Sequence, residues 1–258
     1  MIVITRFAPS PTGYLHLGHV RNAIEVWNFA REHGGKVLLR IEDHDRQRSK
    51  PAFEAAIRED LAWLGFAPDA EVPRQSERDA AYREVLSGLV AQGLVYGCTC
   101  TRAEIINSHY EGTCRNLTIG LRPDVGWRIR IEPGVELFDD LRIGPQQQDP
   151  SAQCGDLLIR DRLGNWTYQW AATIDDYLQG VTHVIRGEDL LDSTGRQIRL
   201  ARLAGRPEPA TFLHHALIMR SPGKKLSKSD GDTGIRELRA RGFSREDVTS
   251  MALHGPPR

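Results

Sequence analysis

The residues Ile2-Val-Ile-Thr-Arg-Phe7, followed by Ala8-Pro-Ser-Pro-Thr-Gly13, give the first indication of the fold class of this 258-residue chain. Its first part is rich in apolar and β-branched residues, as strands are, and its second part is a loop with two prolines and a glycine. Apolar residues then recur at helical spacing from Gly18 until Gly34-Gly35, and residues 36–42 resemble a second strand. Strand, helix and strand in succession indicate a βαβ unit and therefore a parallel sheet.

The same periodicity organises the rest of the chain. It predicts a helix from Pro51 through Leu64 and another that opens at Ser76, with Tyr82, Leu86, Leu89 and Val90 on one face. Residues 126–132 alternate like a half-exposed strand, whereas residues 133–155 are rich in Pro, Gly, Gln and Asp and are expected to form a surface excursion. Strands are expected at residues 181–186 and 214–219, with a helix at 193–203 between them. We therefore expect a parallel α/β sheet split by an insertion.

Charge and composition exclude several classes of protein. Lys plus Arg and Asp plus Glu are both 34, which excludes a wholly electrostatic nucleic-acid binder but leaves room for a local basic patch. No apolar stretch approaches the roughly 18 residues that a membrane span needs, and the first residues lack the pattern of a secretory signal. We expect a cytoplasmic monomer without membrane contact.

His16-Leu-Gly-His19 stands where the first loop enters the first helix. A helix N-terminus favours anions such as phosphate, and two imidazoles one turn apart add hydrogen-bond donors. Gly18 leaves space for a planar ligand against the backbone. The four letters alone also fit two surface histidines beside a helix cap, but their place at the carboxyl end of the first strand favours a ligand site.

A second motif, Lys225-Leu-Ser-Lys-Ser229, lies in a stretch of lysines, serines and one glycine. Lysine is a mobile point charge that suits a migrating negative charge, such as departing pyrophosphate. By itself the stretch is equally typical of a solvated basic loop.

Three of the four cysteines, Cys98, Cys100 and Cys114, lie within 17 residues. In a chain without an export signal, such crowding favours a metal over a disulfide, and the spacing fits a structural zinc site with thiolate ligands. Reduced thiols in a small core are the alternative. His109 and Tyr110 both lie between the cysteines, and imidazole is the commoner zinc ligand, so the spacing leaves the fourth ligand open.

In this order and on a βαβ frame, the histidine and lysine motifs resemble the two signatures of class I aminoacyl-tRNA synthetases. Arg6-Phe-Ala-Pro-Ser-Pro-Thr-Gly13, Arg40-Ile-Glu-Asp43 and Val181-Thr-His-Val-Ile-Arg-Gly-Glu-Asp-Leu190 resemble the glutamyl branch. Only 29 residues follow Ser229, too few for a further core, so no anticodon-binding domain is expected. With the cysteine pattern and Asp192-Ser-Thr-Gly-Arg-Gln197, the chain resembles the glutamyl-Q tRNA(Asp) synthetase family.

The resemblance implies a ligase that activates glutamate with ATP, without tRNA, and transfers it to the queuosine base in the anticodon of tRNA(Asp). ATP, L-glutamate and queuosine-containing tRNA(Asp) would be its partners, with one structural Zn²⁺ and with Mg²⁺ accompanying ATP. The alternatives are a truncated glutamyl-tRNA synthetase that charges the tRNA 3′ end, a non-catalytic tRNA-binding paralogue, and a cytidylyl- or adenylyltransferase. The last of these would not explain Arg6, Glu42 and the lysine motif.

The resemblance also implies residue roles. The catalytic residues would be His16, His19 and Lys228. Glutamate would contact Arg6, Phe7, Ala8, Pro9, Ser10, Glu42, Tyr168 and Arg186. ATP would contact His16, Gly18, His19, Lys225, Ser227, Lys228 and Ser229. Zinc would be held by Cys98, Cys100, Tyr110 and Cys114. Arg6 would face the side-chain carboxylate of glutamate and Glu42 its α-ammonium group.

The change in sequence pattern along the chain sets the expected domain limits, and the resemblance supplies the name of the fold. Residues 1–93 and 161–219 would be the two halves of a Rossmann-type catalytic domain. The zinc-bearing insertion would occupy residues 94–160, and a short extension with the lysine loop would occupy residues 220–258.

Overall fold

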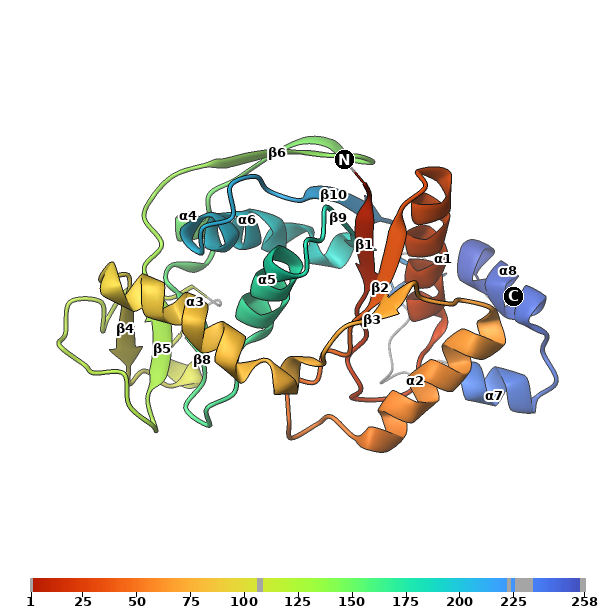
Figure 1. The fold of residues 1–258 in the computed structure, drawn as a ribbon, viewed down its shortest axis with the longest axis horizontal. Helices are drawn as coiled ribbons and strands as arrows, with labels where there is room; N and C mark the ends of the chain where they lie inside the picture. Colours follow the sequence, from red (N-terminus) through yellow and green to blue (C-terminus); the bar gives the residue numbers. More distant parts are fainter. Residues whose placement is uncertain (1, 106–108, 222–223, 226–233, 256–258) are drawn as a thin grey trace. The chain divides into compact units, whose positions relative to one another are not determined.

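A computed structural model of the chain describes residues 2–105, 109–221, 224–225 and 234–255 (Figure 1). The chain forms two compact units. The first unit contains Met1–Arg74, Val181–Leu191 and Phe212–Arg258, and the second contains Gln75–Gly180 and Asp192–Thr211. No helix in the described ranges is both long enough and apolar enough to cross a membrane. The domain limits expected from the sequence stay a prediction.

The first unit contains a parallel sheet. β1 (Ile4–Phe7) pairs in parallel with β2 (Lys36–Leu39), and β2 pairs in parallel with β3 (Ala70–Glu71). β9 (His183–Gly187) lies alongside β1, and β10 (Thr211–His215) is the neighbour of β9. The prediction of an α/β fold with a parallel sheet is confirmed. The strand expected at residues 214–219 instead spans Thr211–His215, so it begins three and ends four residues earlier than predicted. Apolar residues continue from Ala216 to Met219 beyond its end, so the pattern sets no clear limit.

Four helices surround this sheet's core. α1 (Leu17–Glu32) and α2 (Pro51–Leu64) confirm the predicted helices, and α2 ends at Gly65 in the left-handed region. α7 (Ile235–Ala240) and α8 (Arg245–His254) were not foreseen from the sequence; α8 packs against α1 and α2. Figure 1 shows α1 next to β1 and β2. Their apolar faces share one core that includes Phe7, Trp27, Ile57, Ile185, Leu213, Ile235 and Val248.

The second unit combines helices with an antiparallel sheet. After a short 3₁₀ turn (Gln75–Glu77), it contains α3 (Asp79–Ala91), then β4 (Val95–Cys98), β5 (Gly126–Ile129) and β8 (Leu157–Arg160) in the order β4–β5–β8. α5 (Tyr168–Leu178) and α6 (Thr194–Leu203) pack against each other. Val90, expected on the same face of α3 as Tyr82, Leu86 and Leu89, is exposed, because it follows buried Leu89 by one position and is turned about 100° away on the helix.

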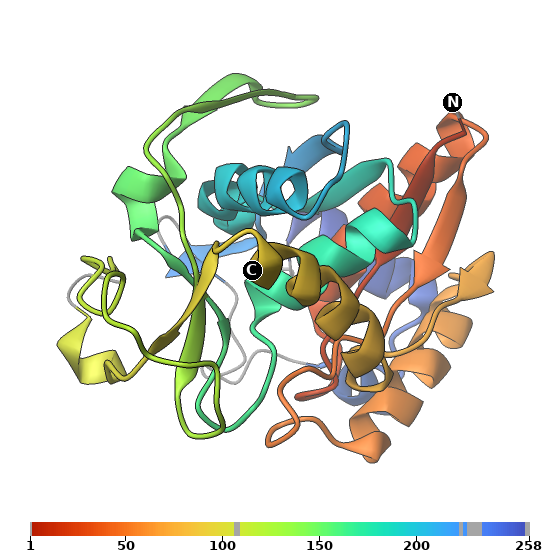
Figure 2. The same ribbon diagram turned by 60° about the vertical axis from the view of Figure 1, so that its left-hand side comes forward.

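Residues 133–155 are more regular than expected. They form the antiparallel hairpin β6 (Glu136–Asp140) and β7 (Gly144–Gln148), drawn in green in Figure 2, and the short helix α4 (Pro150–Cys154). The turn is closed by Asp140, whose Oδ1 accepts hydrogen bonds from the backbone N–H groups of Arg142 and Ile143 at 3.0 and 2.9 Å. A polar composition predicts exposure correctly, but it does not exclude a two-stranded hairpin.

Candidate functional site

The proline-rich loop after β1 is fastened along the segment that follows β2. The backbone N–H groups of Arg40, Glu42 and Lys50 each donate to a carbonyl at 3.0 Å, those of Phe7, Pro9 and Pro11 respectively. These hydrogen bonds bring the loop beside Glu42 at the carboxyl ends of two adjacent parallel strands, where α/β sheets commonly bind ligands. Arg6 and Glu42 are both buried, each 5% exposed.

Glu42 has a cation of its own. Arg40, which is fully buried, donates from Nη2 to Glu42 Oε1 at 2.9 Å and from Nε at 3.3 Å. A buried carboxylate needs such a partner to stay charged. The sequence motif Arg40-Ile-Glu-Asp43 includes Arg40, but it did not indicate that Arg40 orients Glu42. An arginine two residues from an acidic residue in a buried strand extension is the signal that could have indicated it.

Arg186 on β9 is held at three points. Its Nε donates to Nε2 of His214 at 3.0 Å, its Nη2 donates to the Leu190 carbonyl at 3.2 Å, and its guanidinium lies 5.3 Å from the centre of the Phe212 ring. Since His214 accepts at Nε2, its own proton is on Nδ1. His214 is buried on β10, and no sequence pattern pointed to it.

The other residues predicted to contact glutamate lie in different surroundings. Phe7 points into the apolar core, with its ring centre 5.6 Å from that of Trp27. Pro9 is buried, whereas Ala8 and Ser10 are half-buried. Tyr168 is the first residue of α5, in the second unit, and is half-buried. The structure therefore gathers Arg6, Glu42 and Arg186 in one unit, and the role of each residue stays a prediction.

His16 and His19 together cap α1. Nδ1 of His16 accepts a hydrogen bond from the Gly18 N–H at 3.0 Å, and Nδ1 of His19 accepts one from the His16 N–H at 3.1 Å. The two ring centres are 3.9 Å apart. Because both Nδ1 atoms accept, both neutral rings carry their proton on Nε2 and present an N–H donor at the start of the helix.

Gly18 is required by this cap. A Cβ at position 18 would lie 2.9 Å from Cε1 of His16, closer than side-chain atoms pack. The sequence suggested that Gly18 leaves space for a ligand, and the structure shows that it also leaves space for the His16 ring.

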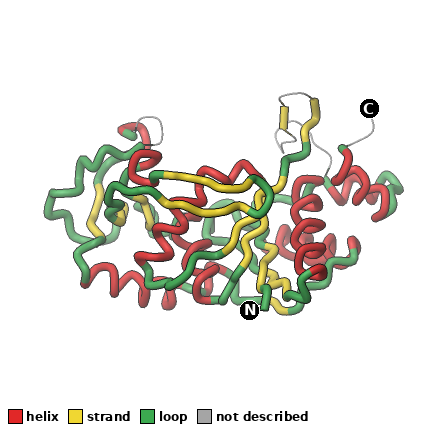
Figure 3. The backbone as a smooth tube through the Cα atoms, turned by 90° about the horizontal axis from the view of Figure 1, so that it is seen from above, coloured by secondary structure: helices red, strands yellow, loops and turns green. Residues whose placement is uncertain are grey.

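The chain returns to the histidine motif after the lysine motif. Gly234 forms an antiparallel bridge with His16, and the Ile235 N–H donates to the Leu15 carbonyl at 3.0 Å. Lys225 lies in β12 (Lys224–Lys225), which pairs antiparallel with β11 (Met219–Ser221); Figure 3 shows the pair as two short yellow segments. Ser227, Lys228 and Ser229 lie outside the described residues.

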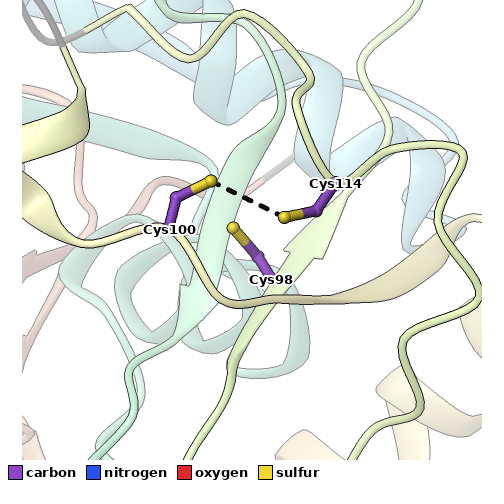
Figure 4. Close-up of side chains that lie close together, drawn as sticks. All are labelled: Cys98, Cys100 and Cys114. Atoms are coloured by element: carbon purple, nitrogen blue, oxygen red, sulfur yellow. Dashed lines mark hydrogen bonds between the residues drawn. The ribbon is translucent and has the colours of Figure 1, made fainter.

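The three cysteines of the second unit converge (Figure 4). The Sγ atoms of Cys98, Cys100 and Cys114 all lie within 4.8 Å of one another, and those of Cys100 and Cys114 are 3.6 Å apart. The Tyr110 hydroxyl lies 3.4 Å from the Cys98 sulfur and accepts a hydrogen bond from the Cys114 N–H at 2.8 Å. Three sulfur atoms and a phenol oxygen are a donor set that fits a tetrahedral metal ion.

His109 lies apart from this donor set. Its Nδ1 is 3.1 Å from the Glu111 carboxylate and its Nε2 is 3.1 Å from the Ser151 carbonyl, so both ring nitrogens have other partners. Tyr110 is held in place by a backbone bridge to Gly155, where a Cβ would lie 2.0 Å from the Tyr110 carbonyl oxygen. The only convergent metal-binding group found in the described ranges is the cysteine triplet.

A buried cation lies against the cysteines. Arg128 of β5 donates from Nε to the Cys98 sulfur at 3.3 Å and from Nη1 to the Asp156 carbonyl at 2.7 Å, and its guanidinium lies 3.7 Å from the centre of the Tyr110 ring. Arg128 was missed because the alternating pattern of its strand suggested an exposed side chain, whereas it is 5% exposed. Its positive charge favours thiolates, which are the metal-binding form of cysteine.

The thiols differ in acidity. Burial acts to raise the pKa of the Cys114 thiol, but hydrogen bonds from the backbone and hydroxyl of Thr99 and from Cys100 and Tyr110 outweigh it and lower the pKa to about 7. Burial and the hydrogen bond with Cys114 raise the pKa of the Cys100 thiol to about 11. Without a metal, one thiol of the cluster is therefore much more acidic than its neighbour.

Comparisons with known proteins agree on one family. A family model described as "tRNA synthetases class I (E and Q), catalytic domain" matches residues 2–118 and 128–254. A protein of Burkholderia cenocepacia named glutamyl-Q tRNA(Asp) synthetase is 45% identical over 244 residues, which are 89% of this chain and 81% of that protein. A protein of the same name from Acinetobacter baylyi is 41% identical over 254 residues, with 98% and 86% covered.

The fold has solved relatives as well. The crystal structure of a glutamate–tRNA synthetase from Elizabethkingia anophelis matches with a TM-score of 0.84 and 30% identity over 98% of this chain. This chain spans 61% of the length of that protein. A structure from Campylobacter jejuni, described as a putative arginyl-tRNA synthetase, matches with a TM-score of 0.58 at 11% identity and shows likeness of fold alone.

Proposed function

Because the chain belongs to the class I tRNA synthetases and, within them, to the glutamyl-Q tRNA(Asp) synthetases, we propose that it is an ATP-dependent ligase of that specificity. It activates glutamate without tRNA and transfers the glutamyl group to the queuosine base in the anticodon of tRNA(Asp). The observation that carries this proposal is the 45% identity to a protein of that name over 89% of the chain.

Glutamate binds through its three charges. Arg6 takes the side-chain carboxylate, for which a planar guanidinium fork is the right shape, and Glu42 takes the α-ammonium group. Arg186 on the neighbouring strand β9 adds a second cation. Support comes from burial: Arg6, Glu42 and Arg186 are all buried in the first unit, where a charged ligand interacts with them more strongly than it would in water. The contacts of Phe7, Ala8, Pro9, Ser10 and Tyr168 are proposed by family resemblance alone.

Activation needs alignment rather than a protein nucleophile. A carboxylate oxygen of glutamate attacks the α-phosphorus of ATP, the bond from phosphorus to the pyrophosphate oxygen breaks, and glutamyl-adenylate forms. The Nε2–H groups of His16 and His19, at a helix N-terminus, bind phosphate oxygens and stabilise the growing charge. Mg²⁺ supplies further neutralisation of phosphate charge when it is bound with ATP.

The lysine motif completes the ATP site in this proposal. Lys228 pairs with the departing pyrophosphate, while Lys225, Ser227 and Ser229 contact the nucleotide. The pairing of Gly234 with His16 supports the assignment, since it fastens the chain six positions after Lys228 to the histidine motif. In the second step, a hydroxyl group of the acceptor attacks the glutamyl carbonyl, and AMP leaves with the electron pair of the anhydride bond.

Cys98, Cys100, Cys114 and Tyr110 are proposed to hold one Zn²⁺. A closed set of four protein ligands leaves no position for substrate, so the ion is structural. The converging sulfur atoms, the hydroxyl of Tyr110 beside Cys98 and the charge of Arg128 support this assignment.

The decisive experiment follows where glutamate goes. Queuosine-containing and queuosine-free tRNA(Asp) are incubated with the protein, ATP and glutamate, digested with ribonuclease and analysed by mass spectrometry. We expect glutamate only on the anticodon fragment of the queuosine-containing tRNA. Glutamate on the 3′-terminal adenosine of either tRNA would instead establish a truncated glutamyl-tRNA synthetase, which the solved structure at 30% identity keeps as the second candidate.

A further inference from the structure

A turn after β8 in the second unit is built to present two side chains to solvent. Asp161 closes it, because its Oδ1 accepts from the backbone N–H groups of Leu163 and Asn165 at 2.9 and 2.8 Å, and its Oδ2 accepts from the Asn165 amide at 3.0 Å. Arg162 and Leu163 project from this turn, and Leu163 is 71% exposed. The turn holds an apolar and a cationic group in fixed positions at the surface.

Two pockets share this turn as a wall. The cysteine-side pocket has a volume of about 680 Å³, which includes the space beside the proposed zinc ligands Cys98, Cys100 and Tyr110. Beyond these ligands it extends along Leu157, Leu158, Gln169 and Arg196. The arginine pocket has a volume of about 460 Å³ and is bounded by Arg83, Arg122, Trp127 and Arg160 among others. Asp161, Arg162 and Leu163 line both pockets. Each volume suits a nucleotide-sized group.

Their charge is strongly positive in a chain whose formal net charge is zero. The residues lining the two pockets include seven arginines and three aspartates, and neither lysine nor glutamate: Arg83, Arg102, Arg122, Arg128, Arg160, Arg162, Arg196, Asp124, Asp156 and Asp161. Arginine forks match phosphate geometry, so the excess of arginine favours a phosphate-bearing ligand.

The cysteine-side pocket also contains polar atoms that lack partners. Oε1 of Gln169 and Nε of Arg196 are buried and form no hydrogen bond within the described part of the chain. A buried acceptor and a buried donor each cost free energy when left unsatisfied. Small side-chain movements would let the hydroxyl groups and base edge of a nucleoside reach both atoms, while the half-buried Leu158 offers an apolar surface to its base.

We propose that the Asp161–Gly164 turn and its two pockets form a binding site for unpaired RNA, an inference that rests on the proposed transfer to tRNA. One nucleoside enters the cysteine-side pocket, its base packs against Leu163, and the phosphates next to it bind in the arginine pocket. Two adjacent pockets divided by one turn fit linked nucleotides better than a single free nucleotide. The anticodon loop of the acceptor tRNA offers such a segment.

The test measures binding of a fluorescent RNA hairpin with the anticodon stem–loop sequence of tRNA(Asp) to the zinc-loaded full-length protein. Leu163→Ala is compared with Leu137→Ala on β6, because the two leucines are 71% and 72% exposed. Arg122→Ala is compared with Arg245→Ala, because their side chains are 61% and 59% exposed and each lies beside an acidic residue. Neither control residue lines either pocket.

We expect Leu163→Ala to weaken binding about tenfold without changing its salt dependence, since only apolar contact is lost. Arg122→Ala should weaken binding and lower the slope of log K against log salt by about 0.7, the value for one phosphate contact with a single strand. Both control variants should bind like the wild type. Equal affinity in all four variants would overturn the proposed RNA site.

A second measurement separates this inference from the proposed function. Glutamate-dependent pyrophosphate exchange should be unchanged in all four variants, because none of these residues is assigned to activation. If the wild type transfers glutamate to tRNA(Asp) but the hairpin binds Arg122→Ala and Leu163→Ala normally, the proposed function stands and the RNA site is wrong. If hairpin binding depends on Arg122 and Leu163 but no transfer occurs, the RNA site stands and the proposed function is wrong.

Discussion

The histidine motif of the first unit and the cysteine cluster of the second are held in place by different forces. His16 and His19 cap a helix whose apolar face lies in a large continuous core with Trp27 and Ile185. The cysteines lie in a separate small cluster whose buried members are Tyr96, Cys98, Tyr110 and Cys114. Apolar burial therefore suffices for the first site, whereas the second needs bonds among its own polar groups, and a metal ion would provide them.

Removing the proposed zinc ion should destabilise the second unit and leave the first unit folded. A structural zinc ion contributes on the order of 10 kcal/mol of binding free energy to the segment that holds it. Chelation or Cys98→Ser should abolish zinc binding and expose the amides of residues 95–130 to hydrogen exchange, while α1 and β1 stay protected. Transfer should fall further than glutamate-dependent pyrophosphate exchange.

Cys154→Ser is the matched control for this experiment. Cys154 is also buried, but its thiol donates to the Pro150 carbonyl at 3.1 Å and is not part of the converging triplet. Zinc content and exchange should stay normal in this variant. Loss of pyrophosphate exchange in Cys98→Ser with α1 still protected would show that the cysteine cluster acts in activation itself.

Lys228→Ala should have the opposite effect to zinc removal: adenylate formation should be lost, while the zinc content stays unchanged. A cation that meets charge developed only in the transition state contributes about 2.7–4 kcal/mol, so adenylate formation should slow roughly 10²- to 10³-fold with little change in glutamate affinity. Rapid-quench measurement of adenylate formation checks this. Lys225→Ala is the comparison. A larger defect in that variant would show that Lys225, rather than Lys228, pairs with the departing pyrophosphate.

Glutamine should be a poor substrate, and comparing it with glutamate tests the role proposed for the charge of Arg6. An amide in place of the side-chain carboxylate leaves Arg6 without its charge-assisted bond, worth about 1.5–3 kcal/mol, or roughly 10- to 150-fold in kcat/KM for activation. Pyrophosphate exchange with each amino acid measures the ratio. Equal rates would mean that Arg6 does not face the side-chain carboxylate.

Gly18→Ala should have the smallest effect, and its loss of stability tests the helix cap. The new Cβ displaces the His16 ring and weakens a cap worth about 1 kcal/mol, so the melting temperature should fall and KM for ATP should rise. Gly88→Ala on α3 is the control, because nothing lies within 4 Å of its added Cβ. That substitution should stabilise the protein by about 0.4–1 kcal/mol. A Gly18→Ala protein as stable as Gly88→Ala would show that the cap tolerates a side chain.

Local sequence signals predicted three helices well but missed α5, although its residues Trp170, Ala171 and Ile174 are buried. α1, α2 and α6 lie within one or two residues of their expected limits, because each carries apolar residues at helical spacing. The β6–β7 hairpin and β4 were not predicted, since the hairpin is largely polar and β4 is only four residues long. Short or polar strands depend on their pairing partners, which a local pattern does not contain.

The chemical groups of the two sites can be identified in the amino-acid sequence: the paired histidines at a helix start, three closely spaced cysteines, and the arginine and glutamate near the ends of two strands. Their supporting contacts come from the packing of the folded chain. Arg128 reaches Cys98 across 30 positions, Arg186 reaches His214 across 28, and Gly234 pairs with His16 from the far end of the chain. Such contacts arise when distant segments pack together, and that packing reflects the burial of the whole chain rather than the preferences of any one stretch.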